Sequence, residues 1–308
     1  MLRGPLDQRD FRGQFSGHET FPLRYGWLKK VVDALSDTTR KGSRRVFDPD
    51  LAMAHFGVGK NMVASMKHWS LAAGVIEANS NGETRVSDLG RLLFADGGLD
   101  PYMEHPASLW AIHWKIAGSP HKTTTWFWAF NHYDAARLDR EALSADLIHL
   151  YRERGWPRFS KATIRRDVDC FFRTYVVAHT KHGEVSEDSL ECPLAELELV
   201  TLTSTKGSYE FRRGPKPNLP DGVFNFALAE FWQRDSAVET LSVETLTYEP
   251  GSPGRTFKLD EESVVEKLAR IDETTGGMFR WSDTAGLRQV LRTAPDVRPL
   301  DLLQSACR

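Results

Sequence analysis

The segment "GHET" (residues 17–20) places two side chains next to each other that are able to do acid–base or metal chemistry. A neighbouring histidine and glutamate can bind a metal ion or transfer a proton, and nearby cations can stabilise the charge that develops in phosphoryl transfer. His18 and Glu19 form this pair, and Arg24 and Lys30 supply the cations. A structural role is the stronger interpretation, in which Glu19 caps the first helix or pairs with Arg24.

The segment "SPGRTFK" (252–258) is a second candidate for contact with a phosphate. Pro253 and Gly254 predict a turn, and we expect a strand over "RTFKLD" after it. Alternation along that strand places Arg255 on one face and Lys258 on the other. Either cation could hold a backbone phosphate. An ordinary loop with surface charges explains the segment equally well.

Motifs that are typical of nucleases give less support to a catalytic site than the two segments above. Many nucleases hold a metal ion with a carboxylate and an acid-x-lysine element, but this chain contains no Asp-x-Lys or Glu-x-Lys sequence. If the chain cuts a phosphodiester, we still expect a divalent metal, magnesium or manganese, because a metal neutralises the developing charge. Its catalytic residues are therefore not defined by a known motif.

The segment "HFGVGKNMV" (55–63) resembles a nucleotide-binding loop but has the wrong residues around its Gly-Lys pair. Such a loop follows a strand, has a glycine five residues before the Gly of that pair, and has Ser or Thr after the lysine. Here Ala54 and Asn61 occupy those two positions. We therefore expect a turn between two helices and no nucleotide cofactor.

The helix that begins after Gly59 has two different faces. Its inward stripe is predicted to contain Val58, Met62, Met66, Trp69 and Ala73. The opposite face would present Lys60, Ala64, Lys67 and His68, with Asn61 at its edge. Lysine, asparagine and a small alanine suit a helix that enters the major groove of DNA. The alternative is a solvated face that contacts another protein.

The flanking elements predict a winged helix-turn-helix over residues 15–100. A first helix is indicated by apolar residues at every fourth position from Leu23 to Leu35. A second helix begins near Pro49 and ends at Gly57. After the third helix, Asn81 and Gly82 mark the turn of a β-hairpin, which would form the wing.

The rest of the chain predicts a helical part over residues 101–182 and a mixed α+β part over 183–308. In the last part, "LELVTLTS", "SYEFRRG" and "RTFKLD" are expected to be strands. The segments "DGVFNFALAEFWQR", "DEESVVEKLARI" and "SDTAGLRQVLRT" are expected to be helices. The predicted fold is mainly α with small β parts, in the α+β class.

The overall charge excludes a polycation that binds nucleic acid along its whole surface. The formal net charge is −2 over 308 residues, so any such binding must come from local basic patches. One patch contains Arg44 and Arg45. Another follows one face of the helix "SKATIRRDVDCFFRTY", with Arg165, Arg166 and Arg173. Pairing between arginines and aspartates on a wet surface explains this second patch equally well.

No apolar run is long enough to cross a membrane, and the N-terminus has no apolar signal segment. The three cysteines lie far apart and form no CxxC pair. Both features are expected of a cytoplasmic protein without disulfide bonds.

Seven blocks together resemble one bacterial family. They are "FSGHETFPLRYGWLKK", "GVGKNMVASMKHW", "DPYMEHPASLWAIHW", "TTTWFWAFNHY", "ATIRRDVDCFFRTY", "ECPLAELELV" and "SPGRTFKLD". The family is domain of unknown function 4007, found among DNA phosphorothioation and phage-defence proteins, including a component of the Ssp system. The resemblance runs from Phe15 to the C-terminus. It implies binding to double-stranded DNA, nicking of one strand and a homodimer. It also implies a cysteine desulfurase, a sulfur transferase and a helicase-like component as partners.

Three hypotheses follow from these observations. The first is a DNA-binding component of a phosphorothioation system that also nicks the duplex. The second is a binding module without catalysis, either a winged-helix regulator or an adaptor that recruits the sulfur-transfer enzymes. The third is an interaction protein that assembles through its aromatic middle part.

Overall fold

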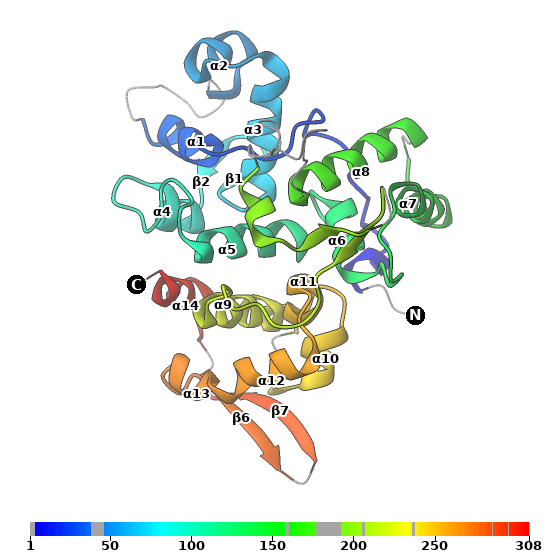
Figure 1. Cartoon of the computed structure of the whole chain (residues 1–308). Coiled ribbons are helices and arrows are strands. Elements are labelled where there is room, and N and C mark those ends of the chain that lie inside the picture. Colours follow the sequence, from blue (N-terminus) through cyan, green and yellow to red (C-terminus); the bar gives the residue numbers. More distant parts are fainter. Residues whose placement is uncertain are drawn as a thin grey trace.

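The computed structural model describes residues 4–37, 46–157, 160–176, 192–204, 207–235, 238–284, 286–294 and 296–307. Most of these residues are in helices, and the strands form small antiparallel sheets. The chain therefore has the expected α+β fold (Figure 1). Within the described ranges, no helix is both long and apolar enough to span a membrane.

Within the described residues, the N-terminal part consists of three helices, a two-stranded hairpin and a fourth helix, and its winged helix-turn-helix character stays a prediction. Its elements are α1 (Trp27–Ser36), α2 (Pro49–Phe56), α3 (Lys60–Ala72), β1 (Ile76–Ala78), β2 (Thr84–Val86) and α4 (Asp88–Phe94). Gly57 and Gly74 follow α2 and α3 with φ of 67° and 65°, a left-handed conformation that favours glycine. β1 and β2 pair in antiparallel register, Ile76 with Val86. A DNA-binding role for this unit stays a prediction.

The middle part is all-helical, as expected, and supplies much of the aromatic core. It contains α5 (Pro106–Ala117), α6 (Thr124–Asn131), α7 (Arg140–Arg154) and α8 (Lys161–Tyr175). Trp110, Trp114 and Trp126 are buried in one hydrophobic cluster, which also includes residues of the N-terminal and C-terminal parts. The tryptophans therefore belong to the core.

The C-terminal part begins with a 3-10 helix and a small hairpin and continues with short helices around a second sheet. Its elements are η4 (Pro193–Leu197), β3 (Val200–Leu202), β4 (Tyr209–Phe211), α9 (Asp221–Trp232), η5 (Gln233–Asp235), β5 (Thr240–Ser242), α10 (Val243–Tyr248), α11 (Pro253–Phe257), α12 (Glu261–Ala269), α13 (Ile271–Thr274), β6 (Phe279–Thr284), β7 (Leu287–Arg292) and α14 (Pro299–Ala306). The predicted strands at β3 and β4 and the predicted helices at α9 and α12 are confirmed.

Two predictions for the C-terminal part are wrong. The segment "SDTAGLRQVLRT" forms most of the β6–β7 hairpin, in which Trp281 pairs with Val290 and Thr284 with Leu287. The segment "RTFKLD" is not a strand, because Ser252 caps α11 by accepting a hydrogen bond from the N–H of Arg255 (3.3 Å). Lys258 then ends α11 in the left-handed conformation, with φ of 56°.

Candidate nucleic-acid interface

The outward face of α3 keeps most of the predicted polar surface. Lys60, Asn61 and Ala64 are exposed. Lys67 is half-buried, with its Nζ 5.2 Å from the centre of the Phe47 ring. α3 contains no acidic residue, so this face carries only positive charge. The inward stripe is also as predicted, since Met66, Trp69 and Ala73 are buried and Val58 and Met62 are partly buried.

His68 does not lie on this outward face, which corrects the prediction. Only 6% of it is exposed, and its ring packs against His18 and Trp69, with centroid distances of 5.8 and 5.3 Å. Burial lowers the pKa of His68 to about 3, so its ring is neutral at physiological pH. The N-terminal segment causes this burial, since a Cβ on Gly17 would lie only 2.5 Å from Nδ1 of His68.

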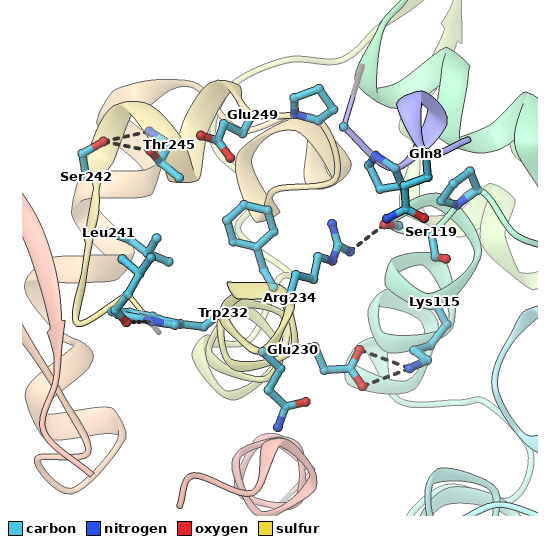
Figure 2. Close-up of a pocket in the computed structure, with 18 of the residues that line it drawn as sticks. Gln8, Lys115, Ser119, Glu230, Trp232, Arg234, Leu241, Ser242, Thr245 and Glu249 are labelled. Atoms are coloured by element: carbon cyan, nitrogen blue, oxygen red, sulfur yellow. Dashed lines mark hydrogen bonds and ion pairs between the residues drawn. The ribbon is translucent and has the colours of Figure 1, made fainter. Parts of the chain in front are cut away.

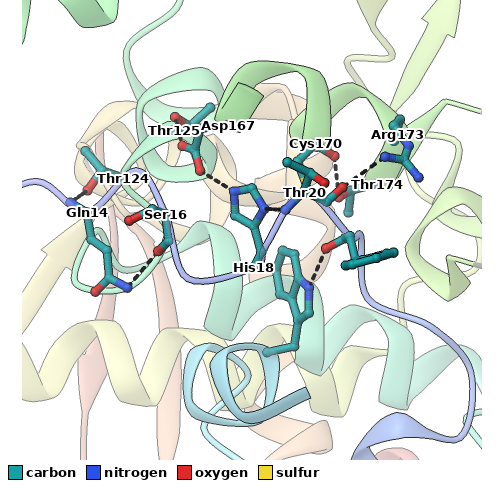
Figure 3. A network of polar contacts seen from close by, with 12 residues as sticks. Gln14, Ser16, His18, Thr20, Thr124, Thr125, Asp167, Cys170, Arg173 and Thr174 are labelled. Atoms are coloured by element: carbon teal, nitrogen blue, oxygen red, sulfur yellow. Dashed lines mark hydrogen bonds and ion pairs between the residues drawn. The ribbon is translucent and has the colours of Figure 1, made fainter. Parts of the chain in front are cut away.

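His18 joins the N-terminal segment to α8 through a buried polar network (Figure 3). Its Nδ1 accepts a hydrogen bond from the N–H of Thr20 (3.0 Å), so Nε2 carries the proton and donates a hydrogen bond to Asp167 (2.6 Å). The second oxygen of the Asp167 carboxylate accepts the hydroxyl of Thr125. The His18 ring also stacks on Trp69 of α3. Both ring nitrogens are therefore engaged in holding the segment between α3 and α8.

In the structure, His18 does not form a common site with Glu19 and Arg24, the other candidates of its segment. Glu19 is exposed and forms no hydrogen bond or ion pair with another described residue. It does not cap α1, whose N-cap position is occupied by Gly26. The guanidinium of Arg24 lies over the rings of Phe21 and Trp27, at 5.5 and 5.7 Å.

The same segment contains a left-handed turn at non-glycine residues. Glu19 and Thr20 have φ of 47° and 67°, and Gly17 before them has φ of 115°. Each such non-glycine residue costs roughly 1–3 kcal/mol and persists only where the surroundings hold it. Here the His18 network holds one side, and Arg173 donates to the carbonyl of Thr20 from the other side (2.9 Å). The turn is therefore fixed between two elements that carry basic residues.

Beside this turn, α8 forms what we call the arginine hollow. Its volume is about 360 Å³, and it is lined by Thr20, Arg140, Arg166, Asp169, Cys170 and Arg173. The structure brings together Arg166 and Arg173, two of the three predicted arginines of α8. It adds Arg140 from α7, a residue that sequence reasoning missed. The third predicted arginine, Arg165, instead pairs with Glu141 (3.3 Å).

The other predicted basic patch, with Arg44 and Arg45, lies outside the described residues.

Arg255 and Lys258 do not form the predicted phosphate-binding strand. Arg255 donates to the carbonyl of Tyr248 (3.0 Å) and to the carboxylate of Asp134 (2.7 Å). Lys258 is only 1% exposed, and its ammonium group donates to the carbonyl of Phe130 (2.5 Å). Burial lowers the pKa of Lys258 well below its ordinary value. Lys258 is thus part of the protein interior and is not available to a ligand.

A larger cavity that sequence reasoning missed lies where three parts of the chain meet (Figure 2). Its volume is about 880 Å³, and residues of η1 (Gly4–Asp7), α5, α9 and α10 contribute to its wall. Within it, Lys115 pairs with Glu230 (2.9 Å), and Arg234 donates to the carbonyls of Gly118 (2.7 Å) and Gly251 (3.1 Å). The lining comes from segments far apart in the sequence and contains no motif that could have indicated it.

The described residues contain no group of three or more His, Cys, Asp or Glu side chains placed to hold a metal ion. Magnesium often takes only one or two protein carboxylates together with substrate phosphates. A magnesium site of this kind needs no group of three such side chains.

Comparison with known proteins places the chain among relatives of known structure. A family model for a protein of unknown function, DUF4007, matches residues 15–306. None of the curated proteins compared matches the chain. The fold is similar to a magnesium ion-bound crystal structure of SspB (TM-score 0.81) and to another crystal structure of SspB (TM-score 0.82). In both cases the sequences are 27% identical, and the match covers 95% of this chain and 86% of the other.

Proposed function

Because the chain belongs to the DUF4007 family, we propose that it is a DNA-binding component of a bacterial DNA phosphorothioation system. In this proposal it nicks one strand of duplex DNA so that sulfur can be incorporated. The observation that carries the proposal is the likeness to SspB over 95% of the chain. The family resemblance implies that SspB is the B component of the Ssp system, which modifies one DNA strand with sulfur.

The basic surface on α3 supports the DNA-binding half of the proposal. In a winged helix-turn-helix, the third helix enters the major groove with its N-terminal residues toward the base edges. Lys60 and Asn61 occupy the first turn of α3 and are exposed. Lysine contacts phosphates or guanine, and asparagine pairs with adenine. The exposed Ala64 one turn later allows close approach to the groove.

The nicking half of the proposal is tested by relaxation of a supercoiled plasmid. We expect the purified protein to convert supercoiled DNA to the open-circular form in the presence of magnesium or manganese, and EDTA to stop the conversion. Lys60→Ala/Lys67→Ala should slow it, because weaker DNA binding lowers the amount of complex. If nuclease-free protein never produces open circles with either metal, the nicking activity is refuted.

The partners proposed for this system are a cysteine desulfurase, a sulfur transferase and a helicase-like component, with the chain itself acting as a homodimer. The family membership supports this set. Co-purification of the tagged chain with these enzymes from cells that express all of them tests it, and analytical ultracentrifugation tests the dimer.

A second candidate function is a non-catalytic DNA-binding regulator or adaptor. It is favoured by the missing acid-x-lysine motif. This candidate predicts duplex binding with a steep salt dependence and no strand breakage. The plasmid assay, combined with a binding titration, therefore separates the two functions.

A further inference from the structure

We infer that the arginine hollow on α8 is a binding site for one phosphate group of the DNA backbone. This inference rests on the proposed DNA-binding function and adds a second contact, separate from α3. Its basis is the chemistry of the side chains that line the hollow.

The hollow has an excess of positive charge. Arg140, Arg166 and Arg173 contribute three guanidinium groups, and Asp169 contributes one carboxylate, so the net charge is +2. Arg140 already pairs with Asp169 (2.8 Å), and its guanidinium stacks on Phe172 with a centroid distance of 4.3 Å. Arg140 is therefore held in place and neutralises the charge of Asp169. Arg166 and Arg173 remain for a ligand.

Those two arginines keep most of their hydrogen-bond donors. Arg166 is exposed and forms no hydrogen bond or ion pair with any other residue that the structure describes. Arg173 uses one nitrogen, Nη1, to hold the carbonyl of Thr20. A guanidinium has five N–H donors in a fork that matches two oxygens of a phosphate. The pair is thus suited to a group with several anionic oxygens.

The location of the hollow favours a phosphate carried by DNA. One of its walls is Thr20, in the left-handed turn that also packs against α3 through His18 and Trp69. The hollow and the buried side of α3 are therefore connected through one short segment of the chain. Its volume of about 360 Å³ is near the lower end of the roughly 300–1,000 Å³ range of small-molecule sites. A free nucleotide is the other source of the same chemistry, and the experiment must distinguish the two.

The first arm measures duplex binding against salt concentration by fluorescence anisotropy. Each phosphate contact contributes about 0.9 to the slope of log K against log salt. Arg166→Ala should lower this slope by about that amount. Arg152→Ala is the matched control, on the neighbouring helix α7 with the same change in charge but outside the hollow, and should keep the wild-type slope. Arg166→Lys keeps the charge but loses the fork, so it should weaken binding while retaining most of the slope.

An equal change of slope in Arg152→Ala and Arg166→Ala overturns the inference, because it indicates diffuse charge. In that case DNA binding itself still stands. If the wild type binds no duplex, the proposed function fails together with the DNA-backbone assignment.

The second arm follows the melting temperature with deoxyadenosine monophosphate and with inorganic phosphate. If either compound stabilises the wild type but not Arg166→Ala, while the DNA slopes are all equal, the site belongs to a free phosphate compound and the backbone assignment is overturned. If neither compound raises the melting temperature of the wild type, and Arg166→Ala does not specifically lower the salt slope, the hollow is not a phosphate site.

Discussion

At the scale of single residues, burial decides which candidates can act. Polarity and spacing indicated His68 as a DNA contact, yet the neighbouring segment covers it. Lys258 is similarly buried, whereas Lys60, Asn61 and Arg166 are exposed as expected. Helical periodicity locates the side of α3 that packs against α1, but it contains no information about a second segment that covers another side.

The buried His68 should make the stability of the protein depend on pH. Below its ordinary pKa of 6.5, the unfolded chain takes up a proton that the folded chain refuses until about pH 3. The free energy of unfolding therefore falls as the pH drops below 6.5. At pH 5 the loss through this residue is at most about 2 kcal/mol, since one pH unit corresponds to about 1.4 kcal/mol.

Urea unfolding at pH 7 and pH 5 measures this effect. His68→Gln cannot titrate, so its loss of stability between the two pH values should be smaller than that of the wild type. His113, whose pKa burial also lowers to about 3, is present in both proteins and cancels in the comparison. An identical pH dependence of the two proteins would mean that folded His68 takes up a proton as easily as the unfolded chain does.

At the scale of elements, a helix-rich unit closed by an antiparallel hairpin occurs twice. The C-terminal unit runs β5, α10, α11, α12, α13, β6 and β7, with sheet order β5-β7-β6. Its third main helix, α12, contains Glu261, Glu262 and Glu266, whereas α3 contains two lysines and no acid. Phosphates repel an acidic helix, so of the two units the N-terminal one is suited to DNA.

Charge changes on α3 and α12 test this difference. Lys60→Ala/Lys67→Ala should weaken duplex binding and lower the salt slope by up to about 1.8, or about 0.9 for each lysine that no longer neutralises a phosphate. Glu262→Gln/Glu266→Gln on α12 changes the same number of charges and should leave the binding no weaker. Anisotropy titrations at several salt concentrations provide the measurement. Unchanged affinity after the lysine substitutions would instead support the interaction-protein hypothesis.

The wrong helix prediction in the C-terminal part has its physical reason in strand pairing. In "SDTAGLRQVLRT", Leu287, Val290 and Leu291 follow the i, i+3, i+4 spacing of a helix face. Pairing with β6 and β5 places them in a strand instead, where Val290 is the buried residue. Cross-strand partners that lie far away in the sequence therefore override the local pattern. The helices of the N-terminal unit were predictable because glycines and a proline mark their ends locally.

At the scale of the whole molecule, Arg234 connects the middle part to the C-terminal part. It donates to Gly118 at the end of α5 and to Gly251 before α11, at the large cavity (Figure 2). The packing is tight, since a Cβ on Gly251 would lie 2.3 Å from Nη1 of Arg234. No local pattern could predict this contact, because Arg234, Gly118 and Gly251 come from three separate segments.

Arg234→Met should therefore destabilise the fold by about 0.5–1.5 kcal/mol for each missing hydrogen bond, because Arg234 is itself exposed and water reaches the site. Gln233→Ala, at the exposed neighbouring position, is the control and should change stability by less than about 0.5 kcal/mol. Chemical denaturation measures both variants. Equal stability of Arg234→Met and the wild type would mean that water satisfies the two carbonyls equally well.

The contact between His18 and Asp167 has a consequence for synthesis of the protein. The two residues are 149 positions apart, and the ribosome makes the N-terminal one first. The left-handed turn cannot be locked until more than half of the chain has emerged, because its carboxylate partner does not exist before then. A nascent chain that stops before α8 should therefore carry α3 without the contact between His18 and Asp167, so the proposed DNA-binding unit should be completed only late in translation.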